Sequence, residues 1–150
     1  MMLPTLDEEY GLREVLPLIP VTRLRQMGWQ TEVWVIDGGS KDLSIEIAEQ
    51  YKCEVIKQAG QGKGAAMRTG FNKFMSIDKD ALVMLDADGT YDPAEIPKFV
   101  HNLESHDVVI GDRLHGTIEP GAMTRMNYFG NHMLTSVSYT HLRAHETDSY

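Results

Sequence analysis

Three aspartates follow a short apolar run in the middle of the chain, and their spacing could do chemistry. Residues 81–85 (ALVML) are apolar, and Asp86, Asp88 and Asp92 come within the next seven positions. An apolar run of this length, bounded by turn residues, is typical of a strand that is covered on both faces. Ionised carboxylates are costly to bury unpaired, so we expect these aspartates at the end of the strand, where water, a cation or a ligand can contact them.

The Asp86-x-Asp88 spacing suits a divalent cation. Side chains two residues apart point to the same face of a strand, so both carboxylates can turn toward one ligand. One could hold Mg²⁺ or Mn²⁺, which prefer oxygen ligands, while the other binds a ribose hydroxyl or a metal-bound water. The alternative is an ordinary surface turn, since Asp-Gly and Asp-Pro are common in turns.

The elements that must position these aspartates alternate along the chain. Apolar periodicity predicts a shortened first strand, further strands at 31–37, 53–56, 81–86 and 107–112, and helices at 8–18, 41–51, within 59–75, and at 93–103. Such alternation indicates an α/β, Rossmann-like fold with a mostly parallel central sheet flanked by helices. Ligands bind sheets of this class at the carboxyl ends of the strands.

Three of the predicted strands end in polar residues at that edge. Asp37 closes one strand, Asp86 and Asp88 follow another, and Asp112 and Arg113 follow a third. One such ending could arise by chance, whereas three together indicate a site.

A glycine-rich stretch, GQGKGAA at residues 60–66, precedes a predicted helix. Its glycines allow close backbone approach, and Lys63 with the helix N-terminus suits a diphosphate. The stretch lacks the spacing and the Ser/Thr of a P-loop, so a plain loop stays the alternative.

Composition limits the classes of partner. The 150 residues suffice for one domain with a real core, and the formal charge of −8 disfavours nucleic acid or an anionic membrane as a general partner. The single cysteine, Cys53, speaks against a disulfide framework and for a reducing compartment. The sequence has neither a signal-peptide pattern nor an apolar run of 18 residues, so we expect a cytoplasmic location.

Five blocks of the sequence, in their order and spacing, resemble the family 2 glycosyltransferases with a GT-A fold. The blocks are LPTLDEE, VIDGGSKDLSIEIAEQY, GQGKGAAMRTGF, VMLDADGTYDPAEIPKFV and VVIGDRLHG, and the resemblance covers roughly residues 3–136. Within the family they are similar to the dolichyl- and polyprenyl-phosphate sugar synthases. The resemblance implies metal-assisted transfer, with Mg²⁺ or Mn²⁺, of a sugar from a UDP- or GDP-linked donor. The implied acceptor is a polyprenyl or dolichyl phosphate at the cytoplasmic face of a membrane.

The resemblance also implies roles for residues of the donor site. Pro4, Thr5 and Glu8 would border the base and ribose, and Asp37 would contact the base. Asp7 stands where the family usually has asparagine, and Gly38 where it often has a second acidic residue.

Further implied roles concern the phosphates and the metal. Lys63 would contact the nucleotide sugar, and Asp86 and Asp88 would make the ribose and metal contacts, Asp88 being a catalytic residue. Arg113 would be catalytic through binding phosphate, although Asp112 replaces the usual serine before it. Arg125 is the nearest candidate for a second phosphate-binding arginine.

Two other functions remain open at this stage. A chain with the same residues could be a non-catalytic, nucleotide-sugar-binding remnant. A nucleotidyltransferase shares the α/β layout and the metal-binding carboxylates, but normally carries a glycine-rich, basic signature after its first strand, where this chain has TLDEE.

The last 14 residues, 137–150 (VSYTHLRAHETDSY), break the pattern of the rest of the chain. They show no sustained apolar face and resemble a translated adapter read-through, so we expect a GT-A domain at 1–136, incomplete at both ends, and a disordered or non-native tail.

Deleting residues 137–150 should lower the free energy of unfolding by less than about 1 kcal/mol, because a segment without an apolar face buries little surface. Thermal unfolding of the shortened and the complete chain measures this. A large fall in melting temperature would show that the tail is part of the fold.

Overall fold

A computed structural model describes residues 1–111 of the chain. Its contacts divide the chain into a unit Met1–Val109 and a second unit Ile110–Tyr150, of which only residues 110 and 111 are described. Arg113, Arg125 and the tail at 137–150 lie outside the described residues.

The described unit is built on a parallel sheet. Its strands are β1 (Met2–Thr5), β2 (Trp34–Asp37) and β3 (Glu54–Lys57), in the order β1-β2-β3. On the other side of β1, the Met2 amide donates to the Val83 carbonyl (2.8 Å) and the Leu85 amide to the Met2 carbonyl (3.1 Å). The segment 83–85 therefore lies beside β1, and the strand order reverses between them. Ligands bind parallel sheets at the carboxyl ends of strands at such a reversal.

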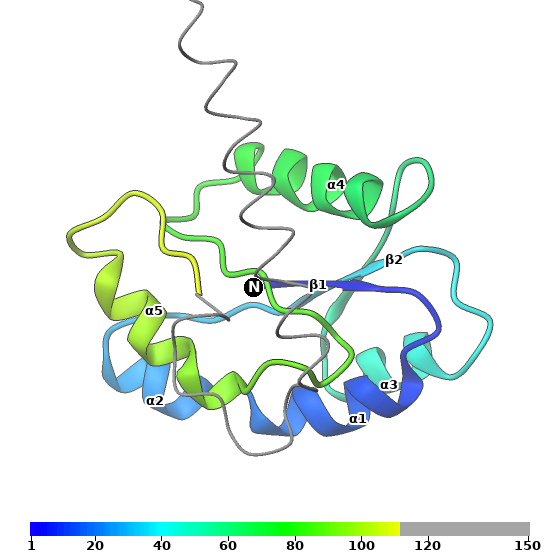
Figure 1. The fold of residues 1–150 in the computed structure, drawn as a ribbon, viewed down its shortest axis with the longest axis horizontal. Helices are drawn as coiled ribbons and strands as arrows, with labels where there is room; N and C mark the ends of the chain where they lie inside the picture. The colour runs from blue at the N-terminus through cyan, green and yellow to red at the C-terminus, as the bar shows by residue number, and fades with distance from the viewer. Residues whose placement is uncertain (112–150) are drawn as a thin grey trace, which may run out of the picture. The chain divides into compact units, whose positions relative to one another are not determined.

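Helices cover both faces of this sheet (Figure 1). One face carries α4 (Lys63–Met75). The other carries the remaining helices: α1 (Glu9–Leu18), α2 (Val21–Gln26), α3 (Ser44–Gln50), and α5 (Ile96–Asn102), which continues from the 3₁₀ turn η1 (Pro93–Glu95). The prediction of a mostly parallel sheet flanked by helices is confirmed.

The alternation of side chains along the strands explains why both faces are covered. Leu3 and Val35 belong to the core beneath α1 and α3, whereas Met2, Trp34 and Ile36 belong to the core beneath α4. All five are at most 2% exposed. Full burial of an apolar side chain of this size contributes about 1.5–3 kcal/mol, so each strand stabilises two layers at once.

Glycine at position 11 brings α1 against the segment that follows residues 83–85. A Cβ built at Gly11 would lie 2.0 Å from the Ala87 carbonyl oxygen and 2.9 Å from the Asp88 Cα. Glycine inside a helix costs about 1 kcal/mol relative to alanine, and this close approach to backbone gives the physical reason for it here. The backbone of the Asp86–Asp88 stretch thus rests directly on α1.

Several predicted elements differ from the observed ones. The stretch 81–86 forms only a single parallel bridge, between Met84 and Met2, instead of a full strand. The predicted helix 41–51 begins only at Ser44, because residues 40–43 form a loop that hydrogen-bonds to residues 7–9. The helix α2 was not predicted at all.

The strand predicted at 107–112 is not formed over residues 107–111, the part of it that the structure describes. Val108 and Ile110 are 72% and 84% exposed. β-Branched composition favours a strand only where a neighbour offers hydrogen bonds, and among the described residues no backbone hydrogen bond joins 107–111 to another segment. The prediction of a strand here is therefore wrong for residues 107–111.

Gly11→Ala should lower the free energy of unfolding by about 1–3 kcal/mol, because the new methyl group overlaps main-chain atoms, which cannot turn aside as the end of a flexible side chain can. Thermal or denaturant unfolding measures the effect.

Gly64→Ala is the matched control, since a Cβ at that position of α4 meets nothing within 4 Å. Its stability should be unchanged or slightly raised by the better helix propensity of alanine. Equal stability of the two variants would show that α1 does not rest on the Ala87 backbone.

Candidate functional site

The carboxyl edge of the sheet brings most of the predicted site residues together. Thr5 ends β1 and Asp37 ends β2, and the two are register partners. Asp86 and Asp88 follow the segment that pairs with the other side of β1. The strand-end prediction for the aspartates is confirmed, although the strand itself is reduced to one bridge.

Asp88 is held ionised by its own turn. Its Oδ1 accepts hydrogen bonds from the Thr90 amide (2.9 Å) and hydroxyl (2.7 Å), and Gly89, with φ of +77°, closes the turn. Burial, the largest influence, raises the pKa of Asp88, but the two Thr90 hydrogen bonds and the charge of Lys63 together hold the pKa below its ordinary value. At neutral pH this carboxylate is therefore an anion with one oxygen left for a ligand.

Asp86 is paired with Lys63. The Lys63 Nζ lies 2.7 Å from one carboxylate oxygen of Asp86 and 2.8 Å from the other. Lys63 is the first residue of α4 and follows Gly60 and Gly62, whose φ angles of +97° and +79° require glycine. The glycine-rich loop thus delivers a cation to the first aspartate of the pair.

Glu8 lies in the field of several carboxylates. Its pKa is raised, first by burial and then by the negative charges of Asp88, Asp42, Asp86 and Asp7. Like charges gathered at this edge favour a bound cation. Within residues 1–111 there is no group of three or more acidic, histidine or cysteine side chains arranged to hold a metal ion by themselves. A divalent ion at Asp86 and Asp88 would take its remaining ligands from a bound molecule or water, as Mg²⁺ commonly does with phosphates.

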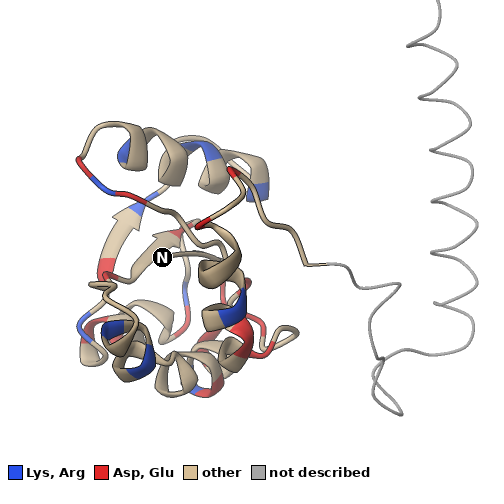
Figure 2. Ribbon diagram, turned by 90° about the vertical axis from the view of Figure 1, so that its left-hand side faces the viewer, with Lys and Arg blue, Asp and Glu red and all other residues tan. Residues whose placement is uncertain are grey.

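Charge is distributed unevenly around this edge. The helix α4 carries only basic charged residues (Lys63, Arg68 and Lys73), while α3 carries only acidic ones (Glu46 and Glu49). Figure 2 shows the basic segments along α4. Of these, Lys63 lies beside Asp86, whereas Lys73 pairs with Glu54 at the start of β3. Lys63 is therefore the positive partner on α4 that an anionic ligand beside the aspartates would find.

Two loops at the site are tied together through their backbone amides. The Glu8 amide donates to the Ser44 Oγ (2.9 Å) and the Glu9 amide to the Asp42 Oδ2 (2.9 Å). In return, the Leu43 amide donates to the Glu9 Oε2 (3.2 Å). These amides belong to the N-terminal ends of α1 and α3, so each helix is capped by residues of the other.

A further pair of bonds extends the same connection. The Lys41 amide donates to the Asp7 Oδ1 (2.6 Å), and the Asp7 amide to the Ser40 Oγ (3.0 Å). Asp7 has a φ of +54°, a conformation that aspartate and asparagine tolerate better than most residues. Asparagine could accept the same bond, so aspartate at this position keeps the loop intact.

Asp42 and Ser44 were not among the predicted site residues. Asp or Ser just before the apolar pattern of a helix is a recognisable N-cap signal, and Asp42 and Ser44 stand at such a place. That signal could have placed them at a helix start, but it does not reveal that they cap a second helix.

The side chains of Asp37 and Thr5 make hydrogen bonds to backbone groups two or three residues away in the chain. Asp37 is 6% exposed, and its oxygens accept hydrogen bonds from the Gly39 (3.0 Å) and Ser40 (2.9 Å) amides. The Thr5 hydroxyl donates to the Leu3 carbonyl (3.0 Å). Both residues, with Pro4 before Thr5, shape the floor of the edge, and their contacts to a base stay a prediction.

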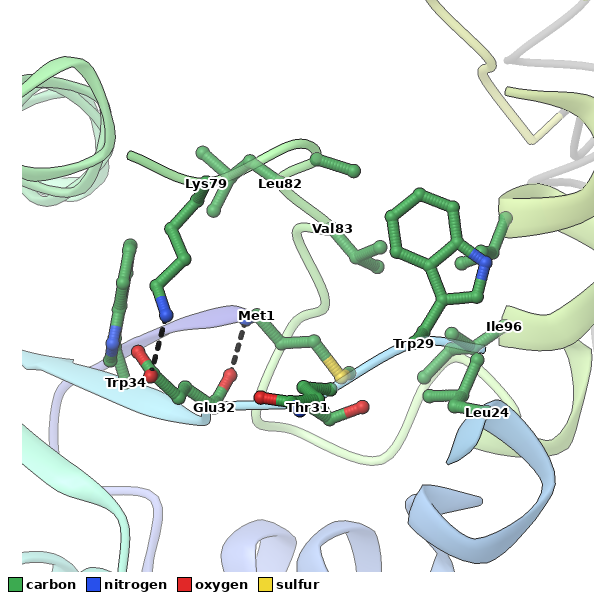
Figure 3. A pocket seen from close by; sticks show the side chains of 13 residues that line it. Met1, Leu24, Trp29, Thr31, Glu32, Trp34, Lys79, Leu82, Val83 and Ile96 are labelled. Carbon is green, nitrogen blue, oxygen red and sulfur yellow. Dashed lines mark hydrogen bonds and ion pairs between the residues drawn. The ribbon is translucent and has the colours of Figure 1, made fainter. Parts of the chain in front are cut away.

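A separate pocket lies at the opposite, amino end of the strands (Figure 3). It is lined by apolar residues including Met1, Trp29 and Val83, and by the ion-paired Lys79 and Glu32. Because Met1 precedes β1, Glu32 precedes β2 and Lys79 precedes the segment 83–85, this pocket is distinct from the edge that carries Asp86 and Asp88. Among the described residues, no helix is long and apolar enough to cross a membrane.

Comparison with known proteins shows the family of this chain. The family model for glycosyl transferase family 2 matches residues 9–149. Glycosyltransferase AglJ of Haloferax volcanii is 38% identical over 135 residues, which cover 89% of this chain and 42% of that protein. Dolichyl-phosphate hexose transferase of the same organism is 33% identical over 132 residues, covering 87% and 54%. Undecaprenyl-phosphate mannosyltransferase of Micrococcus luteus is 31% identical over 119 residues, covering 75% and 49%.

Solved structures share the fold. Glucosyl-3-phosphoglycerate synthase from Mycobacterium tuberculosis, in complex with Mn²⁺ and UDP-glucose, superposes with a TM-score of 0.55 at 25% identity, over 69% of this chain and 38% of that one. The chain spans about half, or less, of the length of the curated relatives described above. The parallel sheet with helices on both faces is a GT-A fold, and the chain belongs to glycosyl transferase family 2.

Proposed function

We propose that this chain is the donor-binding part of a glycosyltransferase that moves a sugar from a UDP- or GDP-linked donor to an acceptor with the help of a divalent cation. The observation that carries the proposal is the position of Asp86 and Asp88 at the reversal of strand order, opposite Lys63 and the N-terminus of α4. Carboxylates for a metal and a cation for a diphosphate thus lie at one edge of the sheet.

The diphosphate of the donor fits the start of α4. Gly62 and Gly64 present no side chain there, and a Cβ at either position would meet nothing within 4 Å. The N-terminus of a helix offers unpaired amides and a partial positive charge to phosphate oxygens. Lys63 adds a full charge at the same place.

The metal would bind at Asp86 and Asp88, with phosphate oxygens completing its coordination. These two carboxylates fit Mg²⁺ or Mn²⁺ because Asp88 stays ionised and both offer hard oxygen ligands. A bound ion would neutralise the negative charge that develops on the leaving diphosphate. Asp88 therefore acts as a catalytic residue by holding the ion at the reacting phosphate.

The nucleoside would lie over the ends of β1 and β2. Pro4, Thr5 and Glu8 would border the base and ribose, and Asp37 would contact the base. The capped loops at 7–9 and 40–44 support this assignment because they fix the backbone around Glu8 and Asp37 before any ligand binds.

The acceptor that we propose is a polyprenyl or dolichyl phosphate at the cytoplasmic face of a membrane. Two relatives, a dolichyl-phosphate hexose transferase and an undecaprenyl-phosphate mannosyltransferase, support this class by their names. A phosphate oxygen is already ionised at neutral pH, so it attacks the sugar without a general base. Arg113, and Arg125 beyond it, are the residues that we assign to phosphate binding.

Manganese together with UDP or GDP should stabilise the chain, by about 2.7 kcal/mol at a hundredfold excess over Kd. Asp88→Asn should abolish the metal-dependent part, because an amide no longer offers an anionic ligand. Thermal shift with and without metal measures both effects.

Asp80→Asn is the matched control, since it makes the same change at an exposed aspartate before the amino end of the 81–85 segment. It should keep the full metal-dependent shift. A folded Asp88→Asn variant that keeps the shift would contradict the metal role of Asp88.

In a full-length homologue, the change equivalent to Arg113→Lys should lower sugar transfer to polyprenyl phosphate at least tenfold, about 1.4 kcal/mol, because lysine lacks the planar fork that binds two phosphate oxygens. Transfer of radiolabelled sugar to polyprenyl phosphate in detergent measures the rate, and the melting temperature should stay nearly unchanged.

Arg25→Lys, at an exposed arginine in the last turn of α2, is the control and should transfer at the parental rate. Parental activity in the Arg113→Lys variant would overturn the phosphate assignment. A loss of stability that matches the loss of rate would instead indicate an ion pair of Arg113 with a carboxylate.

A further inference from the structure

The ion pair between Lys63 and Asp86 occupies the position where a metal ion is needed. The Lys63 Nζ contacts both carboxylate oxygens of Asp86, at 2.7 and 2.8 Å. In the part of the chain that the structure describes, no other basic side chain is ion-paired with Asp86 or Asp88. Without a ligand, this ammonium is therefore the counter-ion of the first aspartate.

The Lys63 ammonium competes with a divalent cation for Asp86. It lies against both carboxylate oxygens, so it repels a second cation there and leaves only their outer lone pairs open. Strong metal binding at Asp86 is therefore favoured when the Lys63 side chain moves away. The Lys63 side chain is 59% exposed, so packing does not hold it in this place. The pair opposes a free metal ion but does not exclude one.

The surroundings of Lys63 allow it to move to a second anion nearby. It stands at the first position of α4, between Gly62 and Gly64, so neither of its chain neighbours has a side chain that could confine it. Its four-carbon stem is flexible, and its ammonium binds phosphate as a point charge from many directions. A diphosphate at the N-terminus of α4 would lie within the range of this side chain.

We propose that Lys63 is an exchangeable counter-ion that makes the site bind metal and nucleotide together rather than metal first. In the empty site Lys63 neutralises Asp86. When a metal–nucleoside diphosphate complex arrives, the metal takes over Asp86 and Lys63 transfers to the diphosphate. This inference rests on the proposed function, because it needs the diphosphate at α4.

If Lys63 exchanges Asp86 for the diphosphate, one substitution at this position should change the affinity for metal and the affinity for nucleotide in opposite directions. Lys63→Met keeps the length of the stem and removes the charge. Without the competing ammonium, the variant should bind free Mn²⁺ at least threefold more tightly than the parent. Without the phosphate contact, it should bind UDP or GDP in the presence of saturating Mn²⁺ at least threefold more weakly.

The two affinities are measured separately. Electron paramagnetic resonance of unbound Mn²⁺ gives the affinity for the metal alone, and calorimetric titration with UDP and with GDP at saturating Mn²⁺ gives the affinity for the nucleotide. Lys98→Met is the matched control, since it removes the same charge from an exposed i,i+3 pair with Glu95 on α5. Both of its affinities should equal those of the parent.

The outcomes separate this inference from the function on which it rests. Tighter Mn²⁺ binding combined with weaker nucleotide binding in Lys63→Met supports the exchange. Weaker nucleotide binding with unchanged Mn²⁺ binding overturns it, leaving Lys63 a simple phosphate contact and the proposed function intact. If the parent binds neither UDP nor GDP with Mn²⁺, the proposed function fails and the exchange fails with it.

Discussion

Repulsion among carboxylates at one edge of the sheet is the constraint on which the rest of the structure depends. Asp86, Asp88 and Glu8 share this edge, and the raised pKa of Glu8 reflects both its burial and its acidic neighbours. The chain meets the repulsion locally, with Thr90 hydrogen bonds to Asp88 and the Lys63 ammonium on Asp86. Asp88 keeps its second oxygen free of these bonds, and Asp86 is neutralised by a lysine whose side chain is largely exposed, so the crowding of carboxylates favours a bound cation.

Two glycines let helices approach closely beneath the site. The Ala87 carbonyl lies where a side chain of residue 11 would otherwise be, so the contact with α1 sets the position of the Asp86–Asp88 stretch. On the other face, Gly70 lets α4, which begins at Lys63, pack on the Met2 side chain, whose Sδ lies 2.3 Å from the place of a Cβ at residue 70. The positions of the aspartates and of Lys63 therefore both depend on β1, the strand between β2 and residues 83–85.

The order of the main elements and the placement of the aspartates could be predicted from the sequence. The contacts between distant residues could not, for physical reasons. An apolar run that ends in Asp86-x-Asp88 has few possible placements, so the edge of the sheet followed from local pattern. The Lys63–Asp86 pair joins residues 23 apart and the Glu8–Ser44 bond residues 36 apart, and no periodicity encodes such contacts. Residues 107–111 show how a local pattern can mislead. Their β-branched residues predict a strand, but a strand forms only where another segment of the chain offers hydrogen bonds.

The exchange of caps between α1 and α3 has a consequence for how such a site can diversify. Each loop supplies acceptors for the amides of the other, with Ser44 and Asp42 serving α1 and Glu9 serving α3. An insertion in either loop would shift these acceptors and uncap two helices at once. Changes of loop length are therefore poorly tolerated at this place. Variation at this edge is therefore expected to arise by replacing side chains on a loop frame of constant length.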